Sequence, residues 1–356
     1  MTASAPDPDP DTLAAALRAG RREPAAGIRR LVDGVLAGGV DLDAFGRWLV
    51  ALADAGETAA EIAGVAAALR GRMLPLEPLD RPVADTCGTG GDGSGSFNIS
   101  TAAALVVAAA GQPVAKHGNR AVSSRTGSAD MLEALGVKID AGPETAARCL
   151  WEIGLCFCLA PAHHPAMARV GPLRRALGRP TVFNLVGPLC NPAGATVQVI
   201  GVGRPEAREP VAEAARLLGA VRTLVVSGHV GAENRAFDEV SLFGPTDVID
   251  VAAAGTRRFS WTPEDFGLAT LPAGRAADLE VAGPVESAAA IRAVLAGEPG
   301  SRRDVVVLNA AAVLWAAGRA PDPPAARALA EQAIDSQAAA RALGRLVALS
   351  REVAEG

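Results

Sequence analysis

The sequence contains no tyrosine, and aromatic residues make up only 3% of its 356 positions. Proteins that bind single-stranded nucleic acid without sequence preference stack the bases on aromatic side chains, so this scarcity argues against that class. Excess positive charge is also absent, because the formal net charge is −5. Nucleic-acid binders usually carry a basic surface. We therefore expect no nucleic-acid partner.

Long hydrophobic runs are missing as well, although 49% of the residues are hydrophobic. A membrane-spanning helix needs about 20 consecutive apolar residues, and no such run occurs. Residues 1–11 (MTASAPDPDPD) lack the apolar segment of a signal peptide, and their composition predicts a disordered tail. The five cysteines form no CxxC pair, which is typical of reduced thiols. We expect a cytoplasmic protein without a membrane partner.

A glycine-rich turn is the most informative feature that is present. Residues 82–86 indicate a strand, Gly88 to Gly93 (GTGGDG) a loop with few side chains, and residues 100–110 an alanine-rich helix. Exposed N–H groups of such a loop, together with a helix N-terminus, favour a phosphate site. The same letters match the dinucleotide pattern GxGxxG, but the last glycine opens no helix. We expect a ligand with more than one phosphate.

A second polar loop, residues 116–120 (KHGNR), follows the strand expected at 113–116. Open α/β sheets bind ligands at the carboxyl ends of their strands. Lys116 and Lys138 are the only lysines among 34 basic residues. A lysine retained where arginine is the rule suggests that a compact ammonium group is needed. This pattern favours Lys116 as a ligand-binding residue.

Asp238 and Glu239 follow a predicted strand and a polar loop. Magnesium binds to one or two carboxylates, keeps several waters and bridges phosphate oxygens, so this pair could capture Mg²⁺. The alternative is an exposed acidic pair on a loop, since most acidic side chains are solvated. Asp92 could orient a metal-bound water or a sugar hydroxyl. Ser100 could touch the metal or simply cap its helix.

Arg174 is a candidate for binding a planar carboxylate, because the guanidinium group suits bidentate contacts. No local feature separates it from Arg175, and most arginines are solvated surface residues. His164 could form a polar wall of a pocket, or act as a cap or core donor. No Ser/His/Asp elbow, metal-binding His/Cys cluster or GxxxxGK[ST] motif occurs.

The spacing of apolar residues predicts an α/β fold with a small all-α N-terminal domain. Three- and four-residue spacings indicate helices over residues 12–72. Short strands then alternate with helices, which predicts a mostly parallel central sheet covered on both faces. The expected strands are 82–86, 113–116, 155–160, 197–202, 221–227 and 246–251; the expected helices are 100–110, 127–136, 144–153, 165–177, 206–218, 286–296, 302–317 and 323–348. The expected units are the tail 1–11, a helical domain 12–75 and an α/β domain 76–356, hinged at the proline-rich segment 74–82.

Several motifs together resemble the anthranilate phosphoribosyltransferase family over residues 25–350. They are GTGGDG, FNIST, KHGNRAVSS, GSADMLEALG, APAHHPAM, FNLVGPLCNPAG and DEVS, in the family's order. The resemblance implies the hinged two-domain architecture shared with pyrimidine nucleoside phosphorylases, and a homodimer formed through the helical domain. It also implies two Mg²⁺ ions and transfer of the phosphoribosyl group of phosphoribosyl pyrophosphate to the amine of anthranilate, a step of tryptophan biosynthesis.

The resemblance also assigns roles to residues by motif. Those implied to bind phosphoribosyl pyrophosphate are Gly88, Gly91, Asp92, Ser96, Asn98, Ile99, Ser100, Thr101, Lys116, His117, Gly118, Asn119, Arg120, Ser123, Ser124 and Ser128. Those implied to meet anthranilate are Gly88, Asn119, His164 and Arg174, with Arg174 near the carboxylate. Ser100, Asp238 and Glu239 are implied to hold the metal. No residue is assigned as a catalytic acid or base, since an aromatic amine is already nucleophilic when neutral.

Three alternatives stay open at this point. One is a related phosphoribosyltransferase with another aminobenzoate as acceptor. Another is a pyrimidine nucleoside phosphorylase, against which KHGNR and the acidic pair argue. The third is a non-catalytic paralogue that binds nucleic acid, which should be basic and lack the metal carboxylates.

Overall fold

The computed structural model describes residues 8–121, 125–231 and 235–352. Four helices form an N-terminal helical block: α1 (Pro10–Arg18), α2 (Ala25–Ala37), α3 (Leu42–Ala55) and α4 (Ala59–Arg72). Side chains cap three of these helices: Asp9 accepts from Thr12 N–H, Asp41 from Ala44 N–H, and Thr58 forms a reciprocal capping box with Glu61. Because α1 begins at Pro10, the last two residues of the expected disordered tail are helical instead.

An eight-stranded sheet follows, and its mostly parallel character confirms the predicted fold class. The strands are β1 (Ala84–Gly88), β2 (Val114–Gly118), β3 (Leu155–Leu159), β4 (Val197–Gly201), β5 (Arg222–Val230), β6 (Arg235–Phe237), β7 (Thr246–Ala252) and β8 (Gly255–Trp261). Their order is β3-β2-β1-β4-β5-β7-β8, with β6 paired to β5. The first five strands are parallel, whereas β6, β7 and β8 are antiparallel. The sequence pattern did not predict β6, β8 or this antiparallel edge.

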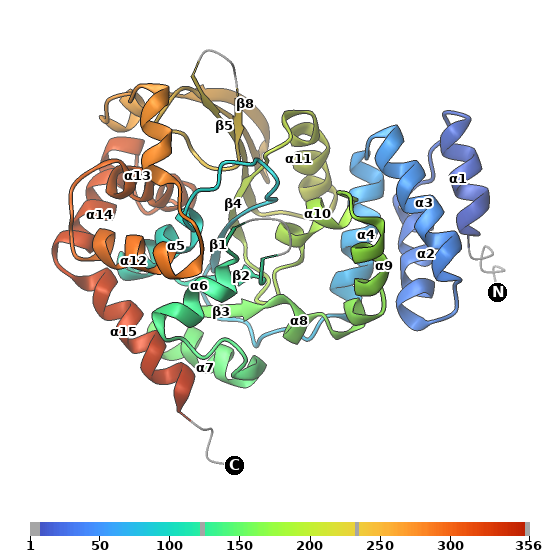
Figure 1. The fold of residues 1–356 in the computed structure, drawn as a ribbon, viewed down its shortest axis with the longest axis horizontal. Coiled ribbons are helices and arrows are strands. Elements are labelled where there is room, and N and C mark those ends of the chain that lie inside the picture. Colours follow the sequence, from blue (N-terminus) through green and yellow to red (C-terminus); the bar gives the residue numbers. More distant parts are fainter. Residues whose placement is uncertain (1–7, 122–124, 232–234, 353–356) are drawn as a thin grey trace.

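The remaining helices cover both faces of the sheet (Figure 1). They are α5 (Ile99–Ala109), α6 (Ser128–Leu135), α7 (Gly142–Ile153), α8 (Ala160–His163), α9 (Gly171–Leu177), α10 (Phe183–Val186), α11 (Arg208–Leu217), α12 (Pro284–Leu295), α13 (Ser301–Ala316), α14 (Pro323–Asp335) and α15 (Ala338–Arg351). Five 3₁₀ helices lie at Pro165–Arg169, Gly187–Cys190, Pro205–Ala207, Pro263–Phe266 and Ala273–Leu279. Two expected single helices are each broken. Residues 165–177 divide into a 3₁₀ turn and α9, and residues 323–348 divide where Gln337 takes a left-handed conformation (φ 61°).

The pleat of the sheet separates two hydrophobic cores. Val199 and Val226 point toward α5 and α13, whereas Ile200 and Val225 belong to a second core that includes α11 and the helical block. Helix α4 packs on α11 and α10, so the helical block joins the core beneath one face of the sheet. The segment that links the block to β1 is anchored as well, since Leu74 N–H donates to His163 O at 2.7 Å. In the described residues, no helix has the length and apolar character required to span a membrane.

Candidate active site

Three glycines at the carboxyl ends of neighbouring strands create the floor of the site. Gly88 of β1 lies opposite Gly201 of β4, and Gly228 lies on β5. A Cβ on Gly201 would lie 1.6 Å from the carbonyl oxygen of Asp238, and one on Gly88 would lie 2.1 Å from Asp238 Oδ2. A Cβ on Gly228 would lie 2.5 Å from the carbonyl oxygen of Glu239. The acidic pair can therefore lie on the sheet only because these strands lack side chains there.

The carboxylates of Asp238 and Glu239 each accept a hydrogen bond from the glycine-rich region. Gly90 N–H donates to Asp238 Oδ2 at 2.8 Å, and Ser100 N–H donates to Glu239 Oε1 at 3.1 Å. Burial, and then the neighbouring negative charges, raise the pKa of both groups. Two partly buried carboxylates with so few donors favour a cation beside them. The alternative that Asp238 and Glu239 form an exposed acidic pair on a loop is therefore wrong.

The glycine loop between β1 and α5 turns repeatedly through left-handed conformations. Gly91 has a backbone φ of 83°, a value that residues other than glycine rarely adopt. Asp92 accepts from both Ser94 N–H and Ser94 Oγ at 3.0 Å, and its Oδ2 lies 3.4 Å from Asp238 N. Asp92 therefore ties the glycine loop to the acidic pair.

Several residues predicted to bind the donor lie just before or in the first turn of α5, and some of them also form hydrogen bonds within the protein. Asn98 Oδ1 accepts from Thr126 Oγ1 at 3.0 Å and from Ser287 Oγ at 2.8 Å. Ser96 Oγ is 3.1 Å from Ser94 Oγ, and Ile99 is buried. Thr101 Oγ1 is buried and, within the described residues, has no hydrogen-bond partner.

Lys116 is buried in the middle of β2, where its Nζ donates to His117 O at 3.3 Å. Its positive charge opposes the effect of burial on two carboxyl groups, those of Glu239 and Asp85. Asp85 was not predicted as a site residue. It accepts from Asn191 Nδ2 at 2.8 Å and from His117 N at 3.3 Å. Burial raises the pKa of Asp85, and an aspartate inside a predicted buried strand was the available sequence signal.

The loop after β2 holds the remaining predicted donor residues. A Cβ on Gly118 would lie 2.1 Å from Ser128 Oγ, which donates to Asn119 O at 3.3 Å. The guanidinium of Arg120 pairs with Asp130 and Glu133, at 2.9 and 2.7 Å. Its side chain is therefore already engaged by α6. Ser123 and Ser124 lie outside the described residues.

Two histidines, His117 and His164, contact each other and the segment 183–190, which comprises α10 and the following 3₁₀ turn. The rings of His117 and His164 lie 5.3 Å apart. His117 Nδ1 is 3.2 Å from Gly187 O, and His164 Nε2 is 3.1 Å from Cys190 O. Each ring therefore donates to a carbonyl, which leaves His117 Nε2 and His164 Nδ1 as acceptors; both are buried and have no partner in the described residues. Burial lowers the pKa of His117 to about 3 and also lowers that of His164.

Arg174 contacts the same segment, because its guanidinium carbon lies 5.3 Å above the ring of Phe183. Burial lowers its pKa, and it forms no ion pair with any described residue. Arg175, the other candidate, is exposed. The structure therefore separates two arginines that sequence alone could not.

The residues present suit magnesium better than a metal that needs a protein cage. No group of three or more His, Cys, Asp or Glu side chains that could hold a metal occurs in residues 8–121, 125–231 and 235–352. Magnesium needs only one or two carboxylates when the substrate's phosphates and waters complete its shell. Asp238 and Glu239 supply that number beside a backbone suited to anions.

Comparisons with known proteins identify relatives of the whole chain. A family described as "Glycosyl transferase family, a/b domain" matches residues 80–340. The anthranilate phosphoribosyltransferase of Rhodopirellula baltica is 45% identical over 89% of this chain and 90% of its own length, and that of a Roseiflexus species is 50% identical over 85% and 87%.

Solved structures show the same likeness. Anthranilate phosphoribosyltransferase from Thermus thermophilus is 44% identical, with a TM-score of 0.86 over 96% of this chain and 99% of its own. The Saccharomyces cerevisiae enzyme in complex with PRPP and Mg is 27% identical, with a TM-score of 0.84 over 95% and 97%. From its sequence, its fold and the arrangement of its site, the chain belongs to the anthranilate phosphoribosyltransferase family.

Proposed function

We propose that this chain transfers the phosphoribosyl group of phosphoribosyl pyrophosphate to the amine of anthranilate and releases pyrophosphate. The observation that carries the proposal is the partly buried pair Asp238–Glu239, hydrogen-bonded to the glycine loop and to the start of α5. Relatives 45% to 50% identical along most of the chain carry the name of this activity. The product, N-(5-phosphoribosyl)anthranilate, would enter tryptophan biosynthesis.

The donor would bind across the carboxyl ends of β1 and β2. Backbone N–H groups of the glycine loop and the N-terminus of α5 favour the phosphates. The residues proposed for this role are Gly88, Gly91, Asp92, Ser96, Asn98, Ile99, Ser100, Thr101, Lys116, Gly118, Asn119, Arg120 and Ser128, with Ser123 and Ser124 beyond the described part. Lys116 would add a buried positive charge.

Asp238, Glu239 and Ser100 would hold Mg²⁺, and two ions are proposed. The magnesium named in the yeast relative's complex supports the choice of metal. When bound, the metal supplies positive charge where the departing pyrophosphate becomes more negative. The protein's own contribution is to keep both carboxylates and the N–H donors in place.

The acceptor would lie against the segment 183–190, with Gly88 and Asn119 at its edge. Arg174, which has no charged partner in the described residues, would bind the carboxylate of anthranilate. His117 and His164 contact each other, so we place His117 on the acceptor side rather than on the pyrophosphate. Their two unpaired ring nitrogens would accept hydrogen bonds from the amine.

The broader organisation is proposed on the family resemblance. The helical domain would span residues 12–75 and the α/β domain residues 76–356, and the helical domain would form a homodimer in the cytoplasm. A phosphorylase or a nucleic-acid-binding paralogue is disfavoured. The net charge of −5 argues against the latter.

One assay tests the activity directly. Anthranilate fluorescence should fall when the protein, phosphoribosyl pyrophosphate and Mg²⁺ are combined, and EDTA should stop the change. Other aminobenzoates, and thymidine with inorganic phosphate, serve as comparison substrates. If a different aminobenzoate but not anthranilate is turned over, the proposed acceptor is wrong. If only phosphorolysis of thymidine is observed, the proposed reaction is wrong and the protein is a nucleoside phosphorylase.

A further inference from the structure

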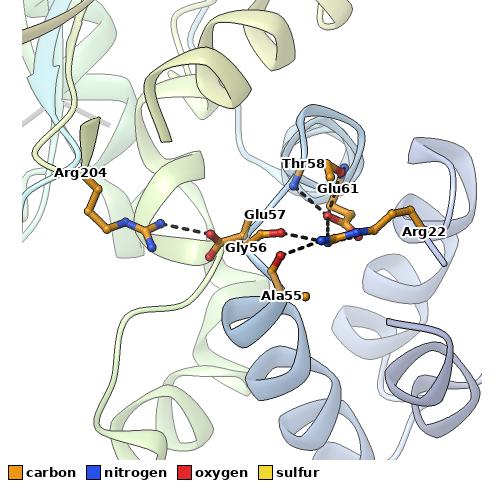
Figure 2. A network of polar contacts seen from close by, with 7 residues as sticks. All are labelled: Arg22, Ala55, Gly56, Glu57, Thr58, Glu61 and Arg204. Carbon is orange, nitrogen blue, oxygen red and sulfur yellow. Dashed lines mark hydrogen bonds and ion pairs between the residues drawn. The ribbon is translucent and has the colours of Figure 1, made fainter. Parts of the chain in front are cut away.

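We infer that the ion pair between Glu57 and Arg204 is a positioning contact through which the helical block sets the geometry of the glycine loop. The inference rests on the proposed function, because it assigns the glycine loop to the phosphoribosyl donor. Neither residue belongs to the proposed substrate or metal sites. The pair connects the α3–α4 turn with the segment that leaves β4 (Figure 2).

Glu57 is a buried carboxylate with one charged partner. Its side chain is only 4% exposed, and Oε2 accepts from Arg204 Nη2 at 3.2 Å. Its other oxygen, Oε1, is buried and has no hydrogen-bond partner in the described residues. A carboxylate so poorly satisfied on one side depends on its single cation. A shift of Arg204 away from the α3–α4 turn would therefore leave the Glu57 carboxylate without a charged partner, at a large cost in free energy.

The turn that carries Glu57 is held rigidly from the other side. Arg22 donates to Ala55 O at 2.7 Å, to Gly56 O at 2.9 Å and to Glu61 Oε2 at 3.0 Å. Glu61 is itself buried and accepts from Thr58 N–H at 2.8 Å. Figure 2 shows these contacts converging on the α3–α4 turn. Glu57 therefore moves with the helical block rather than as a flexible side chain.

The Arg204 end leads to the glycine loop within three residues. Thr89 N–H donates to Gly201 O at 2.8 Å, and Gly203 N–H donates to Thr89 Oγ1 at 3.4 Å. Gly203 also packs against Asp92, since a Cβ on Gly203 would lie 3.0 Å from Asp92 Cβ. Asp92 in turn contacts the acidic pair. Contacts thus run continuously from the helical block to the proposed donor and metal site.

A second ion pair joins the helical block to the rest of the chain and serves as the matched comparison. Asp54 and Arg179 lie 2.7 Å apart, but their side chains are 59% and 41% exposed. Arg179 follows α9, and in the described part of the chain it forms no hydrogen bond or ion pair with the glycine loop. An exposed pair contributes little. Of these two pairs, Glu57–Arg204 is the one that combines a buried carboxylate with a connection to the glycine loop.

The test compares Glu57→Gln, Arg204→Gln, the double variant, Arg204→Lys and Asp54→Asn in the fluorescence assay. We expect KM for phosphoribosyl pyrophosphate to rise by about three- to tenfold in each Gln variant, because residues along a contact network modulate coupling by such amounts. The double variant should show no further rise, since both changes remove one contact. Arg204→Lys keeps the positive charge, so its KM for phosphoribosyl pyrophosphate should stay close to that of the wild type. KM for anthranilate should change by less than about twofold in all variants.

The wild-type protein separates failure of this inference from failure of the proposed function. Inactive wild-type protein would overturn the function, whereas active wild-type protein with unchanged donor KM in the Gln variants would overturn only the positioning role. Three further results would overturn the positioning role. They are an equal rise in both KM values with a large fall in Tm, additive effects in the double variant, and the same rise in donor KM in Asp54→Asn. Arg204→Lys provides a folded comparison if a Gln variant does not accumulate.

Discussion

At the scale of single residues, small side chains and unpaired polar groups define this site. Gly88 and Gly201 leave space that Asp238 occupies, and an added methyl group on either would overlap it. On the acceptor side, His117 Nε2 and His164 Nδ1 are buried without a hydrogen-bond partner in the described residues, and Arg174 forms no ion pair there. The donor side therefore depends on the absence of side chains at the glycines, and the acceptor side on polar groups that the described residues leave without a charged or hydrogen-bonding partner.

Replacing Arg174 with alanine tests the acceptor site. We expect KM for anthranilate to rise roughly 10- to 100-fold, because a hydrogen bond to a charged partner contributes about 1.5–3 kcal/mol. KM for the ribosyl donor should stay within about twofold. Arg175→Ala is the matched control, since Arg175 is exposed one residue away. Equal effects on both substrates, or the same effect in Arg175→Ala, would remove Arg174 from the carboxylate site.

At the scale of elements, α13 holds the acidic pair although it contributes no ligand. Asn309 on this helix accepts from Val240 N–H at 2.9 Å and donates to Val240 O at 3.0 Å. It is 1% exposed, and Val240 directly follows Glu239. The side chain thus pairs with the backbone as a neighbouring strand would. The sequence predicted a helix over residues 302–317 but did not single out Asn309.

Asn309→Leu keeps the approximate size of the side chain but leaves both backbone groups of Val240 unpaired. We expect the free energy of unfolding to fall by about 1–3 kcal/mol, measured by urea denaturation. We also expect more Mg²⁺ to be needed for half-maximal activity, because the adjoining carboxylates lose their support. Gln332→Ala on the exposed face of α14 should change stability by less than about 0.5 kcal/mol. A normal Mg²⁺ requirement in Asn309→Leu would contradict the supporting role.

At the scale of the whole molecule, the helical block shares a hydrophobic core with one face of the sheet. The sheet separates this core from the one that contains α5 and α13. Ile200 and Val225 belong to the same core as Leu49 of α3 and Val65 of α4. The acceptor segment 183–190 lies within this second core, and Phe183, Val186 and Leu189 are buried there. His117 and His164 are buried against this segment, and buried neutral histidines make the stability of the whole protein depend on pH.

His117 should make stability depend on pH in a defined direction. Its folded pKa is lowered from 6.5 to about 3, so below pH 6.5 the unfolded chain binds a proton that the folded chain does not. His117 therefore contributes stability that is complete above pH 6.5 and is lost as pH falls toward 3, at up to about 1.4 kcal/mol per pH unit.

Urea denaturation of wild type and His117→Gln between pH 4.5 and 8.5 checks this dependence. The free energy of unfolding of the wild type minus that of the variant should be constant from pH 7.5 to 8.5 and should decline below pH 6.5. Asp85, Asp238 and Glu239, whose pKa values are raised, act in the opposite direction in both proteins and cancel in this difference. A difference that does not vary with pH would show that His117 is not buried in its neutral form.

The sequence by itself determined the features that depend on neighbours along the chain. The run of glycines from Gly88 requires a backbone that other residues cannot follow, alternating strands and helices predict the parallel sheet, and the motifs imply the family. Periodicity predicted β7 but missed β8, because β8 is exposed along most of its length and lacks an apolar run.

Only the tertiary structure decided which distant residues meet. Gly90 and Asp238 are 148 positions apart and touch because β1, β4 and β5 are neighbours in the sheet. The roles of Asp85, Asn309 and Glu57 likewise depend on partners from other elements, as does the choice of Arg174 over Arg175. Strand order, burial and long-range contacts arise from packing of the whole chain, and no local pattern specifies them.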